Sequence, residues 1–267
     1  MLLKDKVVIV SGTGPGLGIK LAVEAARAGA RGVVCAARTA EKLDAAEAAI
    51  RALGAVAGDC AVLKLPTDIN DATQCQRLVT ETVAKLGRID ALFNSAYEHG
   101  SFEPVAQATL DGWAKLFNTN VVGTMRLTQA VVAQMKQQDG DGGAIVMINT
   151  MATRKPYPGE GAYAASKAAQ EVATKYLAQE VGRHGIRVNS VFMGWMWGAP
   201  VRRGIRMMAK QQGRSEDDVL AGIVANIPLG RMPSDDECAR AALMLASNYA
   251  AAITGACLDA NGGEFMR

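Results

Sequence analysis

Tyr163 and Lys167 stand four residues apart in a segment with helix-like periodicity, so their side chains are expected to share one face of a helix. An ammonium group beside a phenol lowers the pKa of the phenol, which is about 10 when free, and such a pair can transfer a proton near neutral pH. Thr150, thirteen residues before the tyrosine, offers a hydroxyl that can hydrogen-bond a substrate oxygen. Such Tyr–Lys pairs also occur on exposed helix surfaces, and Asn149 or Thr153 are alternatives to Thr150. Proton transfer is the chemistry that this group predicts.

A glycine-rich segment, SGTGPGLG at residues 11–18, follows an apolar run and precedes a helical segment. Glycines let the backbone approach a pyrophosphate closely, and a helix N-terminus offers free N–H groups and a favourable dipole. A glycine-rich segment alone is usually only a turn. Its place between a first strand and a helix favours a dinucleotide-binding site.

The elements that must position these residues follow a βαβ pattern. Short runs rich in Val, Ile, Leu and Ala alternate with helical segments, and they lie at 6–11, 32–37, 61–66, 89–94, 143–150 and 186–192. Their continuous apolar character is typical of parallel strands buried on both faces. The sequence therefore predicts the α/β class, with a single Rossmann-type, doubly wound parallel sheet flanked by helices on both faces.

One domain over residues 1–267 is expected, because no low-complexity linker divides the chain. The Gly/Asp-rich segment 139–143 is predicted to be a loop between a helix and a strand. The segment at about 194–226 is too long for a tight connection, and long loops in compact domains are often lids. We therefore predict a substrate lid there.

Composition excludes several other classes. The 267 residues are 49% apolar and 21% charged, with a net charge of +3 and charges of both signs mixed along the chain, so neither disorder nor a nucleic-acid face is expected. No apolar run approaches the roughly 18 residues of a membrane span. Five cysteines without C-x-x-C spacing favour a reducing, cytoplasmic location, and only two histidines make a metal site a poor expectation.

Further motifs extend over the whole chain, and together they resemble the short-chain dehydrogenase/reductase family. The glycine-rich turn of that family is matched with Ser11 in place of Thr, and its Y-x-x-x-K motif by Tyr163 and Lys167. The other matches are Asp68 after the third predicted strand, NSAY at 94–97 for N-N-A-G, Asn120, IRVN at 186–189, and TG at 254–255 with NGG at 261–263.

The resemblance implies an oxidoreductase that interconverts a secondary alcohol and a ketone by hydride transfer, with tyrosine as general acid/base. It implies Asn120, Thr150, Tyr163 and Lys167 as catalytic residues, with Asn120 holding a water in a proton relay to Lys167. It also implies a homo-oligomer, a tetramer, with no nucleic-acid or membrane partner. The expected cofactor-binding residues are Ser11, Gly12, Gly16, Leu17, Gly18, Arg38, Asp68, Asn94, Ala96, Tyr163, Lys167, Gly194 and Met196.

The chain departs from the family pattern at four positions. Thr150 stands where most relatives have Ser, Tyr97 where they have Gly, Met193 where they have Pro, and Gly198 where a Thr often contacts the cofactor. These departures motivate an alternative function, a catalytically impaired dinucleotide-binding module that acts as a sensor or scaffold. A nucleotide-sugar epimerase is disfavoured by the short C-terminal region, and a serine hydrolase by the lack of a G-x-S-x-G elbow.

The choice between NADP and NAD is expected to depend on the end of the second strand. An acidic residue there would bind an NAD ribose and repel a 2′-phosphate. This chain has Ala37 and Arg38 instead, which favours NADP. Pro15 weakens that preference, since many NADP-preferring relatives carry a basic residue at its position. NAD stays an alternative.

Aromatic residues near the predicted site are candidates for the substrate pocket, namely Tyr97, Tyr157, Trp195 and Trp197. They are as often packing residues as recognition residues. Basic residues are concentrated at 201–214. They predict either recognition of an anionic substrate or an amphipathic lid helix with Ile205, Met207 and Met208 facing inward. The specific substrate and the direction of the reaction are not encoded in any motif.

Overall fold

The computed structural model describes residues 1–138 and 142–266, so most of the loop predicted at 139–143 lies outside the described residues. Its strands are β1 Val7–Ser11, β2 Gly32–Ala37, β3 Ala61–Pro66, β4 Ala91–Asn94, β5 Gly143–Thr150, β6 Ile186–Met193 and β7 Cys257–Ala260. They form a seven-stranded sheet in the order β3-β2-β1-β4-β5-β6-β7. Every neighbouring pair is parallel, as the βαβ pattern predicts.

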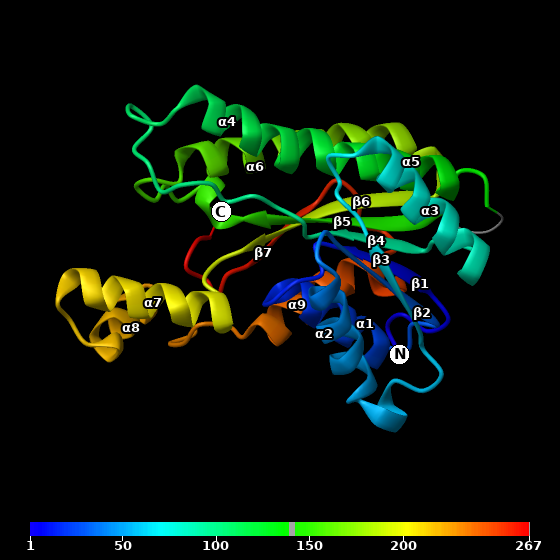
Figure 1. The fold of residues 1–267 in the computed structure, drawn as a ribbon, viewed down its shortest axis with the longest axis horizontal. Coiled ribbons are helices and arrows are strands. Elements are labelled where there is room, and N and C mark those ends of the chain that lie inside the picture. The colour runs from blue at the N-terminus through cyan, green and yellow to red at the C-terminus, as the bar shows by residue number, and fades with distance from the viewer. Residues whose placement is uncertain (139–141, 267) are drawn as a thin grey trace.

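Helices cover both faces of the sheet (Figure 1). On one face lie α3 Ala72–Leu86, α4 Leu110–Phe117, α5 Thr124–Met135 and α6 Gly161–Val181. On the other lie α1 Leu17–Arg27, α2 Ala40–Arg51 and α9 Asp235–Ala246. The predicted doubly wound architecture is therefore confirmed. A π-helix, Asn118–Gly123, joins α4 to α5, and short 3₁₀ helices lie at Gly54–Val56, Met151–Thr153, Gly182–His184 and Asn248–Ala250.

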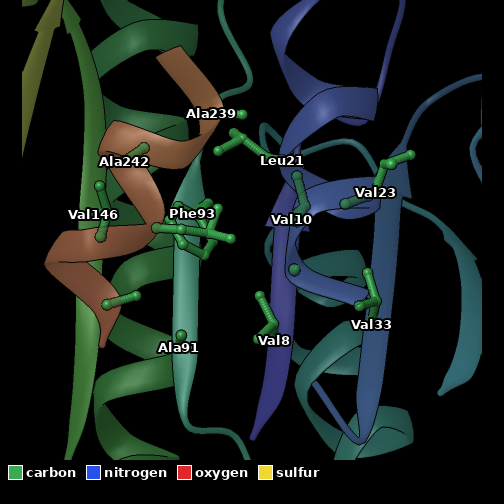
Figure 2. Packing of buried hydrophobic residues seen from close by; sticks show 14 of the residues in the cluster. Val8, Val10, Leu21, Val23, Val33, Ala91, Phe93, Val146, Ala239 and Ala242 are labelled. Carbon is green, nitrogen blue, oxygen red and sulfur yellow. The ribbon is translucent and has the colours of Figure 1, made fainter. Parts of the chain in front are cut away.

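The core consists of two apolar layers, one on each side of the sheet. Figure 2 shows the first layer, in which Phe93 of β4 and Val10 of β1 pack near Leu21 of α1 and Ala239 of α9. The second layer packs the opposite sides of the same strands against α3, α5 and α6. Burying a side chain of this size contributes roughly 1.5–3 kcal/mol. These layers fix the strand ends from which the polar residues project.

The predicted lid contains two helices, α7 Ala199–Gln212 and α8 Glu216–Val224, which extend beyond the sheet (Figure 1). Ser215 begins α8 by accepting a hydrogen bond from the Asp218 amide, as an N-cap serine does. Ile205 of α7 and Val219 of α8 belong to a third, small apolar cluster with Ile227 and Met232. The two helices therefore pack on each other rather than in the main core.

Sequence order reverses beside β1, since β2 and β3 lie on one side of it and β4 to β7 on the other. The register places Ser11 at the end of β1 beside Ala36 of β2 and Asn94 of β4. In open α/β sheets, ligands bind in the crevice outside the carboxyl ends of the strands at such a reversal.

Candidate functional site

A cavity of about 450 Å³ opens at the carboxyl ends of the strands. Its lining includes the glycine-rich turn, the ends of β2 and β5, the start of α6, and the segment that leads from β6 into α7. Of the predicted cofactor-binding residues, the lining contains Ser11, Gly12, Gly16, Leu17, Gly18, Arg38, Asp68, Ala96, Tyr163, Lys167, Gly194 and Met196. The fold thus brings residues from distant parts of the chain to one cavity.

The glycine-rich turn packs so closely against neighbouring backbone that two of its glycines admit no side chain. Gly12 has φ +88°, and a Cβ there would collide with the backbone of Ala96. A Cβ at Gly18 would collide with the carbonyl of Gly12. Gly16 precedes α1 with φ 97° and offers no side-chain cap, and Ile19 N–H donates to the Gly14 carbonyl at 3.1 Å, so the N–H groups of Leu17 and Gly18 are left to another acceptor. This cradle fits a pyrophosphate.

Two cations line the cavity near the glycine-rich turn. Arg38 is exposed directly after β2, and Lys42 of α2 also lines the cavity. The Lys42 side chain lies over the turn, since its Cδ is 3.7 Å from the position of a Cβ on Gly14. The sequence analysis missed Lys42, whose position one helical turn after Arg38 was the available signal.

Asp68 and Asn94 differ in whether they line the cavity. The Asp68 carboxylate lines the cavity and accepts a hydrogen bond from the Asn70 amide at 2.9 Å. Asn94 does not belong to the lining. Its side-chain nitrogen donates to Thr128 Oγ1 at 2.9 Å and contacts Met147 Sδ at 3.2 Å, so the side chain connects β4 to α5 and β5 below the cavity.

Tyr163 and Thr150 meet in the cavity, as their spacing predicts. Both side chains line the cavity, and Thr150 is close enough to affect the ionisation of the Tyr163 phenol. Burial raises the pKa of Tyr163 above its ordinary value, nearby Tyr97 and Glu160 raise it further, and the neighbouring Thr150 hydroxyl lowers it. His99 stacks on the Tyr163 ring with the ring centres 4.5 Å apart.

Lys167 lies one turn further along α6 and is buried. Its Nζ donates hydrogen bonds to the Ile148 carbonyl at 2.8 Å and to Gln170 Oε1 at 3.2 Å. Burial lowers the pKa of Lys167 to about 7. The ammonium is therefore held at the end of β5, on the same helix as Tyr163.

Asn120 is fully buried in the π-helix and does not belong to the cavity lining. Its side chain binds the backbone N–H and carbonyl of Glu98, each at 2.8 Å, and donates to Ser166 Oγ at 2.9 Å. Gln170 Nε2 donates to the Asn120 carbonyl at 3.3 Å, while Gln170 Oε1 accepts from Lys167. The Gln170 amide thus joins Lys167 to Asn120, a contact that no sequence motif indicated.

Aromatic side chains surround Tyr163 at this end of the cavity. Tyr97, Tyr157 and Trp195 belong to the lining, and the Tyr97 ring centre lies 5.9 Å from that of Tyr163. Tyr157 Oη donates to Glu264 Oε1 at 2.8 Å and its ring meets Trp195 edge-on. Trp197 does not belong to the lining and packs instead against the small α7–α8 cluster.

The basic residues of α7 also lie outside the cavity lining. The Arg202 guanidinium lies 5.7 Å from the centre of the Trp197 ring, and Arg206 pairs with Glu216 on the surface. These contacts favour the amphipathic lid helix over anion recognition. Ile205 is buried as predicted, but the inward placement of Met207 was wrong, because 63% of its surface is exposed. Ile205 and Ala209 of the same helix, rather than Met207, belong to the small apolar cluster that α7 shares with α8.

Gly198 explains one departure from the family pattern. A Cβ at this position would press against the carboxylate of Asp235, so the threonine that relatives often carry would require the Asp235 side chain to move. The neighbouring Gly194 is similarly confined, since its Cβ would lie 2.8 Å from that of Asn261. A side chain at either position would therefore displace its neighbour, Asp235 or Asn261.

Glu160 was also missed from the sequence. Its side chain lines the cavity three residues before Tyr163, and burial raises its pKa. Glu160 occupies the N-cap position of α6. Glutamate is uncommon there compared with Ser, Thr, Asp or Asn, and that was the only available signal.

Comparison with known proteins places the whole chain in one family. The family described as enoyl-(acyl carrier protein) reductase matches residues 12–264. The short chain dehydrogenase/reductase astE of Aspergillus oryzae is 33% identical over 98% of this chain and 95% of its own.

Solved structures agree with this match. L-sorbose reductase from Gluconobacter frateurii, complexed with NADPH and L-sorbose, superposes with a TM-score of 0.90 at 25% identity over 100% of this chain and 99% of its own. NAD⁺-bound xylitol dehydrogenase superposes with a TM-score of 0.88 at 27% identity over 98% and 99%. The cavity, the glycine-rich cradle and these relatives together show that the chain belongs to the short-chain dehydrogenase/reductase family of NAD(P)-dependent oxidoreductases.

Proposed function

We propose that the protein interconverts a secondary alcohol and a ketone, with Tyr163 as the general acid/base. The observation that carries this proposal is that Tyr163, Thr150 and Lys167 line one cavity together with the glycine-rich cradle. The names of the xylitol dehydrogenase and L-sorbose reductase relatives support alcohol and ketone substrates.

Four residues of the cavity divide the tasks of this reaction. Thr150 and Tyr163 bind the substrate oxygen, and Tyr163 gives it a proton in reduction or removes one in oxidation. Lys167, when charged, favours the phenolate of Tyr163 and offers donors to the ribose of the cofactor. The nicotinamide supplies or accepts the hydride when it is bound. His99 stacks on the Tyr163 ring and fixes its orientation.

The departure at Thr150 does not by itself favour a sensor or scaffold, since threonine keeps a hydroxyl and lines the cavity together with Tyr163. Nicotinamide absorbance, followed with a panel of alcohols and ketones, tests the enzymatic function. Tyr163→Phe should keep cofactor binding and lose about 10²–10⁴-fold in turnover, the usual contribution of general acid/base catalysis. Thr150→Ser should remain active, whereas Thr150→Val, similar in shape but without the hydroxyl, should lose most activity. A valine variant as active as the wild type would remove Thr150 from the reaction.

NADP is the preferred cofactor in this proposal, and NAD is the alternative. Ala37 brings no carboxylate to the end of β2, while Arg38 and Lys42 supply two cations to the cavity lining. A charged hydrogen bond of roughly 1.5–3 kcal/mol corresponds to about a tenfold to hundredfold change in affinity. The Arg38→Ala and Lys42→Ala variants should each weaken the binding of NADPH by such a factor and the binding of NADH far less. Equal losses for both cofactors would reject the preference.

The proposal also includes a single domain with residues 194–226 as its lid, and a homotetramer. Pro200 supports the lid, because its Cγ lies 3.3 Å from the position of a Cβ on Gly16, beside the cradle. Sedimentation of the purified protein tests the tetramer, and a monomer would contradict it. Among the described residues, no helix has the length and apolar character needed to cross a membrane.

A further inference from the structure

Glu160 has no task in the reaction described above, yet its carboxylate faces the reacting end of the cavity. It lies three residues before Tyr163 in the lining and is close enough to raise the pKa of both Tyr163 and Tyr157. As the N-cap residue of α6 it makes no side-chain hydrogen bond to the helix within the described structure. Helix capping therefore does not explain a glutamate at this position.

No cation neutralises this carboxylate within residues 1–138 and 142–266. None of the ion pairs there includes Glu160. Lys155, five residues earlier, forms an ion pair with Glu264 instead, with Nζ 2.9 Å from Oε1. Arg38 and Lys42 also line the cavity, but neither pairs with Glu160, and the Lys42 side chain lies over Gly14 of the glycine-rich turn. A half-buried, unpaired carboxylate loses hydration, and this loss raises its pKa.

A second polar group beside Tyr163 also lacks a partner. Nδ1 of His99 is buried without a hydrogen-bond partner among the described residues, and its ring stacks on Tyr163. Buried polar atoms in proteins are normally hydrogen-bonded, so each unpaired one calls for an explanation. Tyr157, by contrast, is already bonded to Glu264. Among the described residues, Glu160 and His99 are thus two polar groups beside Tyr163 that are open to a substrate.

We propose that Glu160 determines specificity by accepting a hydrogen bond from a second donor group of the substrate, a hydroxyl or an ammonium close to the reacting carbon. The proposal rests on the alcohol–ketone function above and names its substrate class. Substrates with such a donor, such as diols, hydroxyketones and amino alcohols, are bound at two points. Carboxylic acids and other anions are repelled by the Glu160 charge.

The discrimination should be large because the carboxylate is partly dehydrated. A site built to hydrogen-bond a substrate group strongly rejects an analogue that lacks the group, since the buried protein group is then left unpaired. We expect at least a tenfold preference in kcat/KM for a donor-bearing substrate over its parent alcohol.

The test compares four substrates on one scaffold: cyclohexanol, cyclohexane-1,2-diol, 2-aminocyclohexanol and 3-hydroxycyclohexanecarboxylate. The full-length protein is assayed as wild type, Glu160→Gln and Glu160→Ala, with Glu180→Gln as the control. Glu180 is an exposed residue of the same helix, so its variant removes the same charge away from the cavity. The readout is the ratio of kcat/KM values to that of cyclohexanol, because Glu160 also affects Tyr163 and can alter absolute rates.

The wild type should prefer the diol or the amino alcohol, and Glu160→Ala should reduce that ratio at least tenfold while raising the ratio for the hydroxy acid. Glu180→Gln should leave all ratios unchanged. The glutamine variant distinguishes the two donors: its amide oxygen still accepts from a hydroxyl, so the diol preference would persist in part, whereas an ammonium preference would be lost.

Two outcomes would overturn the proposal, and they differ in meaning. If the enzyme oxidises cyclohexanol and its derivatives with ratios that do not respond to Glu160, specificity does not depend on this carboxylate and the alcohol–ketone function stands. If no alcohol or ketone on this or an open-chain scaffold reacts with either cofactor, the proposed function fails, and the role of Glu160 fails with it.

Discussion

The charge of Lys167 depends on where its nitrogen lies. In the unfolded chain its pKa is about 10.5, whereas burial beside Ile148 lowers it to about 7 in the folded protein. Between these values the unfolded chain binds more protons, so the free energy of unfolding rises with pH over this range. The stabilisation is lost as the pH falls from about 10 towards 7.

Replacement of Lys167 by Met should remove this pH dependence. Relative to the wild type, the Met variant should be most stable near pH 7, and the difference should shrink by at most about 3 kcal/mol up to pH 9.5, at 1.36 kcal/mol per pH unit. Urea unfolding of both proteins without cofactor, repeated across this pH range, measures the difference in their free energies of unfolding. Lys210→Met removes an exposed charge on α7 and serves as the control. A difference that is constant with pH would show that the Lys167 amine is hydrated in the folded state.

Local spacing was enough to predict some of the site residues. Tyr163 and Lys167 share a helix whatever the tertiary structure, and a motif fixed the distance from Tyr163 back to Thr150. Glu160 and Gln170 were not predicted. Their tasks depend on which way a long side chain turns and on what another element brings near it, as the Asn120 carbonyl does for Gln170. Neither spacing nor composition contains that information.

At the scale of elements, the turn between β1 and α1 depends on glycine at particular positions only. Gly12→Ala should disturb it, because Gly12 combines φ +88° with a Cβ position inside the Ala96 backbone. Gly14 is the matched control, since it lies in the same turn and its Cβ would only touch Lys42 Cδ at 3.7 Å and the Gly12 carbonyl at 4.0 Å. We expect Gly12→Ala to lower Tm and to weaken NADPH binding at least tenfold. Gly14→Ala should change Tm and NADPH affinity little. Calorimetry and fluorescence titration would show this, and equal effects of the two variants would contradict it.

Strand prediction succeeded where the apolar runs are long. The runs predicted at 32–37, 61–66 and 143–150 coincide with β2, β3 and β5, and the others differ from the strands by one or two residues. β7, Cys257–Ala260, was not predicted, because four residues are too few to show a period. The π-helix at Asn118–Gly123 was missed for another reason: it depends on long-range contacts such as the bond from Asn120 to Ser166.

At the scale of the whole molecule, stability is distributed unevenly. Two large apolar layers enclose the sheet, whereas α7 and α8 depend on a small cluster around Ile205 and Val219. Regions with few buried apolar contacts open at a lower free energy than the core does. The helices with the fewest buried contacts thus lie next to the cavity, since Pro200 and Val201 at the start of α7 line the cavity.

Hydrogen exchange should therefore separate the two parts of the molecule. Ile205→Ala removes a buried side chain, a change that typically costs 2–5 kcal/mol when the site cannot collapse. Amides of 199–224 should then exchange faster, while those of β5 and β6, which Ile205 does not support, should keep their protection. Because Pro200 lies beside Gly16 of the cradle, adding NADPH should slow exchange in α7 of the wild type, and less so in the variant. If β5 and β6 lost protection together with 199–224, the two helices would unfold only with the sheet, and they could not open as a lid.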